Sequence, residues 1–487
     1  MAKPDFVFDL VHSLSKSEKR HFKLFSSRYK HEGEKKYLGI FRALEKQRNP
    51  VAPPCDENAG GTLARDRHYL SEMLMASLRQ FHAETSIQAQ LGNELISIDL
   101  LRNKGLYQHA LRRLLRLKRE VARYELPELM LQVISLECEI RASAPLEWPA
   151  LAPALFDETE TWLSHLHHLN QLNRLRVEEL RQVLEKGRPQ TEEERREWSQ
   201  RMAAFDPAAS LTGLVSETSL RLRAQAYAYF VIPDFQSANQ SNQRRYELFV
   251  QHPELSEKAP LDYVFLLFFY ASTSIQVSDY ETAGRLLGEL RTLREKYQDS
   301  AYAALVKNID ERLLPTELFL FGKSGHHNRI RERASEVESF IRLNPNRQSA
   351  VIGFNMATAF MFADEYKKAI HWTHLALSTP QFKRDYLLFF ANHILQVLAH
   401  IGLNDFDVAE SLALSAKRFV SQRKNAPRSI DIHIANLLVR LAATDNREAH
   451  VRYATEFLAL FGNDPVYLDT EEYFALRHWL ERTARGK

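Results

Sequence analysis

Four arginines recur at helical spacing after Tyr107, and they form the strongest candidate site in the sequence. At 3.6 residues per turn these side chains fall within about 60° of one another on one helix face. They are Arg112, Arg116, Arg119 and Arg123. The opposite face carries the apolar residues Leu111, Leu114, Leu117 and Val121. The forked guanidinium group suits two-point hydrogen bonding to phosphates or carboxylates, so this face could bind either.

A second basic stripe is expected nearer the N-terminus, on a helix that begins at Lys16. Its members are Lys16, Lys19, Arg20 and Lys23. The other side of this helix carries Phe22, Phe25 and Tyr29, which we interpret as core residues. Three interpretations of the two stripes remain open: a solvated face, a surface for an acidic protein, or a surface for RNA or DNA. No aromatic residues for base stacking are interleaved with the arginines.

Other residues with chemical potential are weaker candidates. Gly322-Lys323-Ser324 resembles the end of a phosphate-binding loop, but Glu317 stands where the leading glycine is needed, and the preceding residues favour a helix. His165, His167 and His168 lack an acidic residue at a spacing that suits a metal site. No catalytic motif occurs. We therefore expect no catalytic residues, cofactor or metal, and a protein that is not an enzyme.

Composition favours an all-α protein of a reducing compartment. The 487 residues include only 16 Gly and 18 Pro, and good helix formers dominate long stretches. Cys55 and Cys138 form no pairing pattern. No stretch approaches the roughly 20 apolar residues of a membrane span, and the N-terminus lacks the apolar core of a signal peptide. The prediction is a cytoplasmic protein that does not contact a membrane.

Charge is divided unevenly along the chain, although the net charge is only +3. Residues 1–123 carry 23 Lys and Arg against 14 Asp and Glu, a net charge of +9. The totals of 65 and 62 then leave 42 basic and 48 acidic residues for 124–487, a net charge of −6. The two parts present different fields to partners, and the basic part could meet an acidic one.

Residues 1–84 are predicted to form a separate helical module with a basic face. Its helices are expected near Asp5–Ser13, Lys16–Tyr29, Glu34–Gln47 and Thr62–Ala83. Ser15 and Glu18 have the spacing of a capping box at the start of the second helix. The segment from Asn49 to Gly61 is rich in proline and glycine, which predicts an exposed loop.

An aromatic residue followed three positions later by Ala recurs through the rest of the chain. The pairs are Tyr107/Ala110, Phe235/Ala238, Tyr280/Ala283, Tyr366/Ala369 and Phe406/Ala409, and Asn446/Ala449 keeps only the Ala. One unit of roughly 40 to 45 residues accounts for the intervals if intermediate copies have lost the pattern. A turn signal precedes each pair, so each unit is predicted to be a helical hairpin, with a small residue where the backbones approach.

The segment from Phe354 to Ala369 is similar to a complete tetratricopeptide repeat. Ala357 and Phe360 stand at the family's small and aromatic positions on the first helix, and Tyr366, Ala369 and Ala376 at those of the second. The resemblance covers residues 85–485 loosely, with a period longer than the family's usual 34 residues. In addition, the segment from Ser13 to Phe25 resembles the start of a group of uncharacterised bacterial helical proteins.

The resemblance implies a tetratricopeptide-like α-α solenoid over residues 85–487, with a C-terminal capping helix within Leu468 to Thr483. Such arrays offer an extended surface for a peptide or a helix. The expected function is a non-catalytic protein interaction scaffold. The alternative is a nucleic-acid- or ribosome-associated protein that uses the basic N-terminal part. The sequence does not indicate the oligomeric state.

Overall fold

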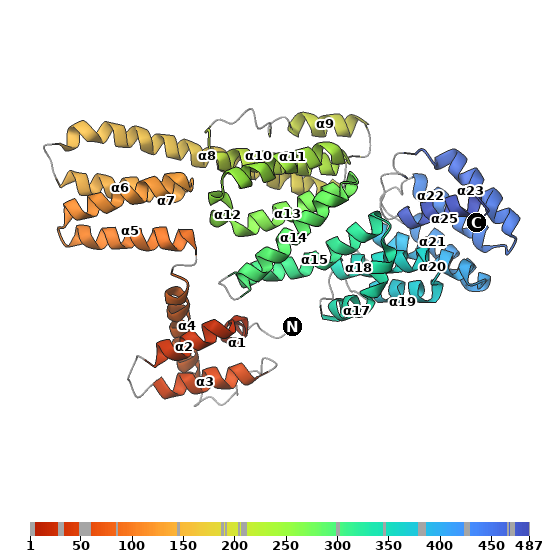
Figure 1. The fold of residues 1–487 in the computed structure, drawn as a ribbon, viewed down its shortest axis with the longest axis horizontal. Coiled ribbons are helices and arrows are strands. Elements are labelled where there is room, and N and C mark those ends of the chain that lie inside the picture. Colours follow the sequence, from red (N-terminus) through yellow and green to blue (C-terminus); the bar gives the residue numbers. More distant parts are fainter. Residues whose placement is uncertain are drawn as a thin grey trace. The chain divides into compact units, whose positions relative to one another are not determined.

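The protein is described by a computed structural model. It describes residues 5–27, 34–47, 60–83, 86–143, 147–186, 189, 192–202, 205, 212–298, 302–343, 347–377, 386–422, 429–464, 467 and 473–486. These residues form helices joined by turns, with no β-strand among them (Figure 1). The prediction of an all-α fold is therefore confirmed.

The first four helices have their own apolar cluster. They are α1 (Phe6–Ser13), α2 (Lys16–Ser26), α3 (Glu34–Lys46) and α4 (Gly60–Phe81). Ser15 and Glu18 form the predicted capping box at the start of α2. The cluster around Phe22, Phe41 and Leu74 contains residues of these helices alone and Leu14, which follows α1. The predicted loop extends too far at its end, because Gly60 and Gly61 already belong to α4; residues 49–59 lie outside the described part.

The chain divides into two compact units. The first comprises residues 1–273 and 288–310, and the second comprises residues 274–287 and 311–487. After α4, the first unit contains α5 (Ile87–Asn103), α6 (Tyr107–Arg123), α7 (Pro127–Ala142), α8 (Trp148–Lys186), α9 (Glu192–Met202), α10 (Val215–Val231), α11 (Phe235–Gln251), α12 (Glu254–Lys258) and α13 (Pro260–Gln276), except for the last three residues of α13, which belong to the second unit. Helix α14 (Tyr280–Tyr297) contributes to both units, and α15 (Ala303–Lys323) crosses the second boundary.

The second unit continues with hairpins of similar length. Its helices are α16 (His327–Glu332), α17 (Ala334–Leu343), α18 (Arg347–Phe362), α19 (Tyr366–Leu377), α20 (Tyr386–Gly402), α21 (Phe406–Ser421), α22 (Ser429–Ala442), α23 (Arg447–Phe461) and α25 (Phe474–Ala484). Consecutive helices pack as pairs, α18 on α19, α20 on α21 and α22 on α23. One cluster of buried apolar residues includes side chains from each of these helices.

The aromatic and alanine pairs mark helix starts, as the sequence predicts. Each aromatic is the first residue of its helix, namely α6, α11, α14, α19 or α21, and each partner alanine is fully buried. In all five turns the residue two positions before the aromatic has a positive φ: 77° at Gly105, 23° at Pro233, 64° at Ser278 and 59° at both Asp364 and Asn404. The local turn chemistry therefore fixes where each second helix begins.

Small residues bring α18 and α19 close together. A Cβ added to Gly353 would lie 3.0 Å from the Cβ of Ala376, so the two backbones approach more closely than larger side chains permit. Ala357, Ala369 and Ala376 are each fully buried. Of the two residues at the close approach, the tetratricopeptide resemblance singles out Ala376 but not Gly353.

Helix α25 packs along several earlier helices of the second unit. It contacts α23 and also α18 and α20. Leu476 and Leu480 are buried in the shared cluster. Arg482 binds Asp364 through both carboxylate oxygens, at 2.8 and 3.2 Å, and the His478 ring meets the Phe362 ring edge to face. The C-terminal helix thus covers more than the last hairpin, for which the sequence predicts it as a cap.

Candidate basic interaction surface

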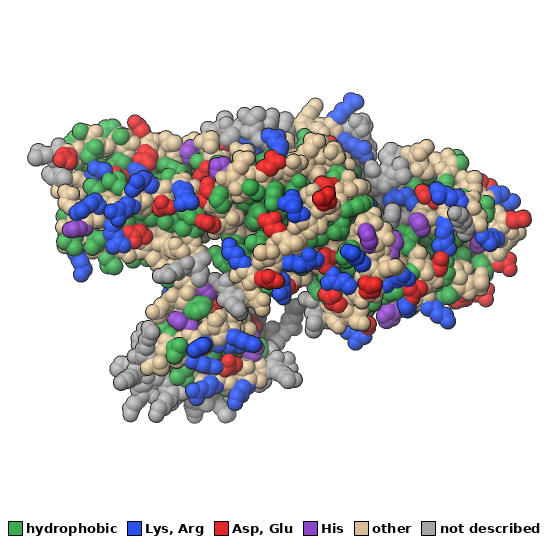
Figure 2. Space-filling model, in the orientation of Figure 1, with side chains coloured by type: hydrophobic (Ala, Val, Ile, Leu, Met, Phe, Trp, Pro, Cys, Tyr) green, Lys and Arg blue, Asp and Glu red, His purple; other side chains and the backbone are tan. Residues whose placement is uncertain are grey.

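The predicted arginine stripe is an exposed face of α6. Arg112, Arg116, Arg119 and Arg123 are all exposed. Leu114, Leu117 and Val121 are buried on the opposite side, where α6 packs on α5 and α7. The first and last of the four arginines are 11 positions apart, which is about 16 Å along a helix. Figure 2 shows Lys and Arg side chains gathered over this helix. The structure therefore places these residues as the sequence predicts.

Most of this face lacks countercharge. Among the described residues, Arg112, Arg116 and Arg119 form no ion pair. Arg123 lies 3.7 Å from a carboxylate oxygen of Glu120, and its guanidinium group stands over the ring of Tyr124, 5.5 Å from the centroid. The three unpaired arginines leave a positive surface that is available to a partner.

Other basic residues of the same helix are committed to internal contacts. Arg113 donates two hydrogen bonds to Glu94 of α5, at 2.7 and 2.6 Å. Lys118 bridges Glu137 of α7 and Glu158 of α8, at 2.8 and 2.5 Å. Burial alone would lower the pKa of Lys118, but the hydrogen bonds to the two glutamates raise it above its usual value. On α6, basic side chains that form internal ion pairs therefore alternate with basic side chains that have no partner among the described residues.

A shallow apolar pocket adjoins the unpaired arginines. It has a volume of about 460 Å³, and its lining residues are Leu101, Leu106, His109, Arg112, Arg113 and Arg116. The turn at Gly105 creates it, because the backbone N–H of Leu106 donates to the carbonyl of Leu101 at 3.0 Å and turns the chain back on itself. The sequence stripe did not reveal this pocket, since Leu101 belongs to the preceding helix.

The second stripe, on α2, is partly neutralised. Lys16, Arg20 and Lys23 are exposed, whereas Lys19 is half-buried. The Nζ of Lys23 lies 3.1 Å from a carboxylate oxygen of Glu45 on α3 and 5.6 Å from the centroid of the Phe41 ring. Phe22 and Phe25 are buried, as predicted for core residues; Tyr29 lies outside the described part.

The segment Gly322–Ser324 and the histidines near position 165 have structural roles in helices α15 and α8. Gly322 and Lys323 end α15, and the Ser324 hydroxyl donates to the carbonyl of Leu320 at 2.7 Å, so this segment is a helix end. His165, His167 and His168 lie within α8, where burial lowers the pKa of His165. Within the part of the chain that the structure describes, no group of three or more His, Cys, Asp or Glu side chains is arranged to hold a metal ion.

Comparison with known proteins adds no family assignment. No protein-family model matches the sequence, and no curated protein matches it significantly. Among the described helices, none is long and apolar enough to cross a membrane.

Proposed function

We propose that this protein is a non-catalytic interaction scaffold, a solenoid of tetratricopeptide-like hairpins that binds a partner peptide or helix in the cytoplasm. The observation that carries the proposal is the α6 face, where Arg112, Arg116 and Arg119 stand exposed and unpaired among the described residues. Their neighbours Arg113 and Lys118 are ion-paired. A face that leaves three adjacent guanidinium groups without carboxylates is suited to an acidic partner.

The pocket beside this face favours a peptide over a nucleic acid. Leu101 and Leu106 supply an aliphatic surface, and the described lining residues include no Phe, Tyr or Trp; the ring among them is the imidazole of His109. Single-stranded nucleic acids bind through several bases stacked on successive aromatic rings, and a single imidazole does not provide such a series. An apolar side chain flanked by carboxylates fits both the leucines and the arginines. A partner helix with Glu at positions i, i+4, i+7 and i+11 would match the spacing of the arginines.

The alternative is a nucleic-acid- or ribosome-associated protein. The observation that favours it is a second unpaired group on α2, where Lys16, Lys19 and Arg20 form no ion pair within the described residues. A partner that neutralised both groups would release many counterions, and its affinity would fall steeply with salt.

Fluorescence anisotropy with defined probes distinguishes the two functions. One probe is a labelled amphipathic peptide with the Glu spacing given above and leucines on its other face. The other probes are a single-stranded RNA and a double-stranded DNA of matched charge. The test variant is Arg112→Gln/Arg116→Gln/Arg119→Gln. The control Arg174→Gln/Arg196→Gln/Arg244→Gln removes the same charge from exposed positions on α8, α9 and α11.

We expect the acidic peptide to bind the unmodified protein and the control equally, and the test variant at least about tenfold more weakly, which corresponds to about 1.4 kcal/mol. Preferential binding of RNA or DNA that the test variant loses would establish the alternative function. Equal binding of the peptide to all three proteins would show that the arginine face is only solvated, and would overturn the proposal.

A further inference from the structure

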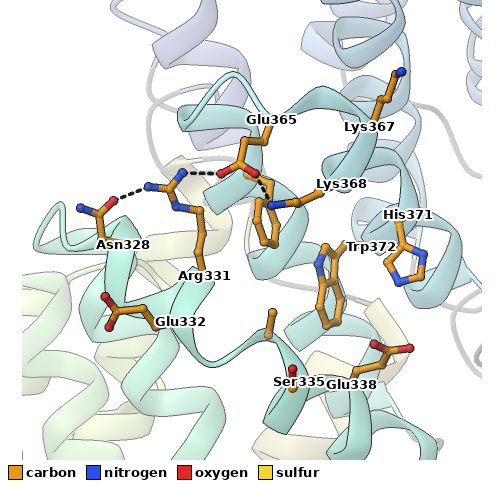
Figure 3. A pocket seen from close by; sticks show the side chains of 12 residues that line it. Asn328, Arg331, Glu332, Ser335, Glu338, Glu365, Lys367, Lys368, His371 and Trp372 are labelled. Atoms are coloured by element: carbon orange, nitrogen blue, oxygen red, sulfur yellow. Dashed lines mark hydrogen bonds and ion pairs between the residues drawn. The ribbon is translucent and has the colours of Figure 1, made fainter.

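A second pocket lies within the C-terminal unit, away from the arginine face in the sequence (Figure 3). It has a volume of about 710 Å³ and is lined from α16, α17, α18 and α19. Its lining includes Arg331, Glu332, Phe360, Lys367, Lys368 and Trp372. We propose that this pocket binds an extended peptide, with an apolar side chain on its aromatic floor and an acidic and a basic residue on either side.

The floor consists of two buried aromatic rings. Phe360 of α18 and Trp372 of α19 are each 3% exposed, and their rings are nearly parallel, with centroids 6.5 Å apart. The Trp372 indole N–H has no hydrogen-bond acceptor among the described residues. Figure 3 shows the nitrogen-bearing edge of the ring turned toward the open space of the pocket.

The indole nitrogen lies at the open side of the pocket and not in the buried interior, so its N–H can donate to an acceptor on a ligand. The backbone carbonyl of a bound peptide would provide one. The same peptide would place its apolar side chain against the Trp372 ring, because the Nζ of Lys368 already stands over the Phe360 ring, 5.4 Å from the centroid. Tryptophan is one of the residue types enriched among those that dominate the binding energy of protein partners.

An ion-paired rim holds the mouth of the pocket in shape. Glu365 accepts from Arg331 at 2.5 Å and from Lys368 at 2.5 Å, and Arg331 is also bonded to the side chain of Asn328. These contacts join α16 to the turn before α19. A rim that is already fixed loses little conformational entropy when a ligand binds.

The charges of the two walls specify the ligand. Lys367, Lys368 and His371 line the α19 side, and Glu332 and Glu338 line the α16–α17 side. The whole lining contains three Lys or Arg residues and three Glu residues. These charges balance, so the pocket does not favour a polyanion such as a nucleic acid. Within the described residues Lys367 and Glu332 form no ion pair, which leaves one free charge on each wall. A peptide with one acidic and one basic residue around its anchor is complementary to this arrangement.

This pocket is independent of the arginine face, since it lies in the other compact unit and has different charges. Its test uses the full-length protein labelled with ¹⁵N at tryptophan indoles, in which the sequence gives five signals. The probe is the acetylated, amidated peptide Ala-Asp-Leu-Lys-Ala. Two further probes are Ala-Asp-Ala-Lys-Ala, which lacks the anchor, and an oligothymidine of eight nucleotides.

Trp372→Phe identifies the Trp372 signal and removes only the N–H donor and part of the ring. Lys367→Glu reverses the free charge on the α19 wall, and Lys417→Glu on α21 is its matched control, since both lysines are exposed and unpaired among the described residues. Thermal unfolding of each variant confirms that it is folded. The exposed charge variants keep the test interpretable if Trp372→Phe unfolds.

We expect the leucine peptide to shift the Trp372 indole signal at about 1 mM, with the other four signals unchanged. Lys367→Glu should weaken binding severalfold, while Lys417→Glu should not change it. The proposal is overturned if the anchorless peptide or the oligonucleotide shifts the signal as strongly as the leucine peptide does. It is equally overturned if no peptide moves the Trp372 signal, whatever the outcome at the arginine face.

Discussion

The ring of Tyr366 lies directly against Gly402, at the end of the neighbouring helix. A Cβ added to Gly402 would fall 2.5 Å from the Cζ atom of the ring. The ring cannot easily move away, because the Tyr366 hydroxyl donates to Asp364 at 2.6 Å and Asp364 is bound in turn by Arg482. The aromatic residue at the start of α19 therefore seals the end of α20, and only glycine leaves room for it.

Gly402→Ala should consequently destabilise the protein, although alanine is the better helix former. Overpacking of this kind costs about 1–3 kcal/mol. The matched control is Gly288→Ala in α14, where no heavy atom lies within 4 Å of the added Cβ. That control should be neutral or stabilising by up to about 1 kcal/mol. Urea unfolding measures both, and equal stabilities of the two variants would contradict the contact described above.

The helix starts were predictable from the sequence because they depend on local chemistry. A turn residue, an aromatic and an alanine lie within six positions of one another, as in Asp364, Tyr366 and Ala369. The structure reveals a further copy that the sequence pattern misses: Gly325 has φ of 77°, α16 begins at His327, and Ile330 is buried where the other copies have alanine. The copies share the geometry of the turn, whereas the alanine is not present in every copy.

The candidate sites were only partly predictable, because pairing depends on residues far apart in the chain. Lys23 belongs to a predicted stripe, but it is paired with Glu45, 22 positions away. Arg112 looks the same in the sequence and has no partner within the described residues. The exposed edge of Trp372 depends on how α19 packs on α18, which no periodicity specifies. Faces could be predicted from the sequence; the free groups on them required the structure.

The second prediction concerns the buried carboxylate of Asp431 on α22. It is fully buried and accepts hydrogen bonds from the hydroxyls of Tyr386 and Tyr473. Tyr473→Phe removes one donor from a desolvated charge, which should cost about 1–3 kcal/mol. Tyr453→Phe, on the partly buried face of α23, is the control and should cost less than about 0.5 kcal/mol. Urea unfolding of both variants tests whether Tyr473 ties α25 to the rest of its unit.

The third prediction is a loss of stability in mild acid that depends on His393. Burial between aromatic rings lowers the pKa of His393, although its hydrogen bond to the Phe389 carbonyl, at 2.9 Å, opposes the shift. The pKa of His393 in the folded protein then lies below its unfolded value of about 6.5. As the pH falls, the unfolded chain therefore takes up this proton at a higher pH than the folded protein does. The contribution of neutral His393 to the free energy of unfolding is fully present above about pH 6.5. It is lost progressively as the pH falls from there toward the folded pKa.

His393→Gln should reduce this pH dependence, because it removes the buried titrating group. The measurement is the urea midpoint at pH 7.5 and pH 5.5 for the unmodified protein, His393→Gln and the control His374→Gln, which changes an exposed histidine of α19. The difference between the two midpoints should shrink in the His393 variant only. An unchanged difference would show that His393 does not cause the acid sensitivity.

The last prediction separates the structural bases of α6 from its free ones. Lys118 bonds Glu137, which is 2% exposed, so Lys118→Met leaves that carboxylate with Arg141 as its remaining described partner. The loss should cost about 1–3 kcal/mol, because a desolvated charge loses a donor. Arg113→Gln breaks an exposed ion pair and should cost less than about 1 kcal/mol. Replacing Arg112, which has no partner to lose, should leave the urea midpoint unchanged. If Arg112→Gln destabilised the protein as much as Lys118→Met does, the arginine face would be part of the fold and unavailable to a partner.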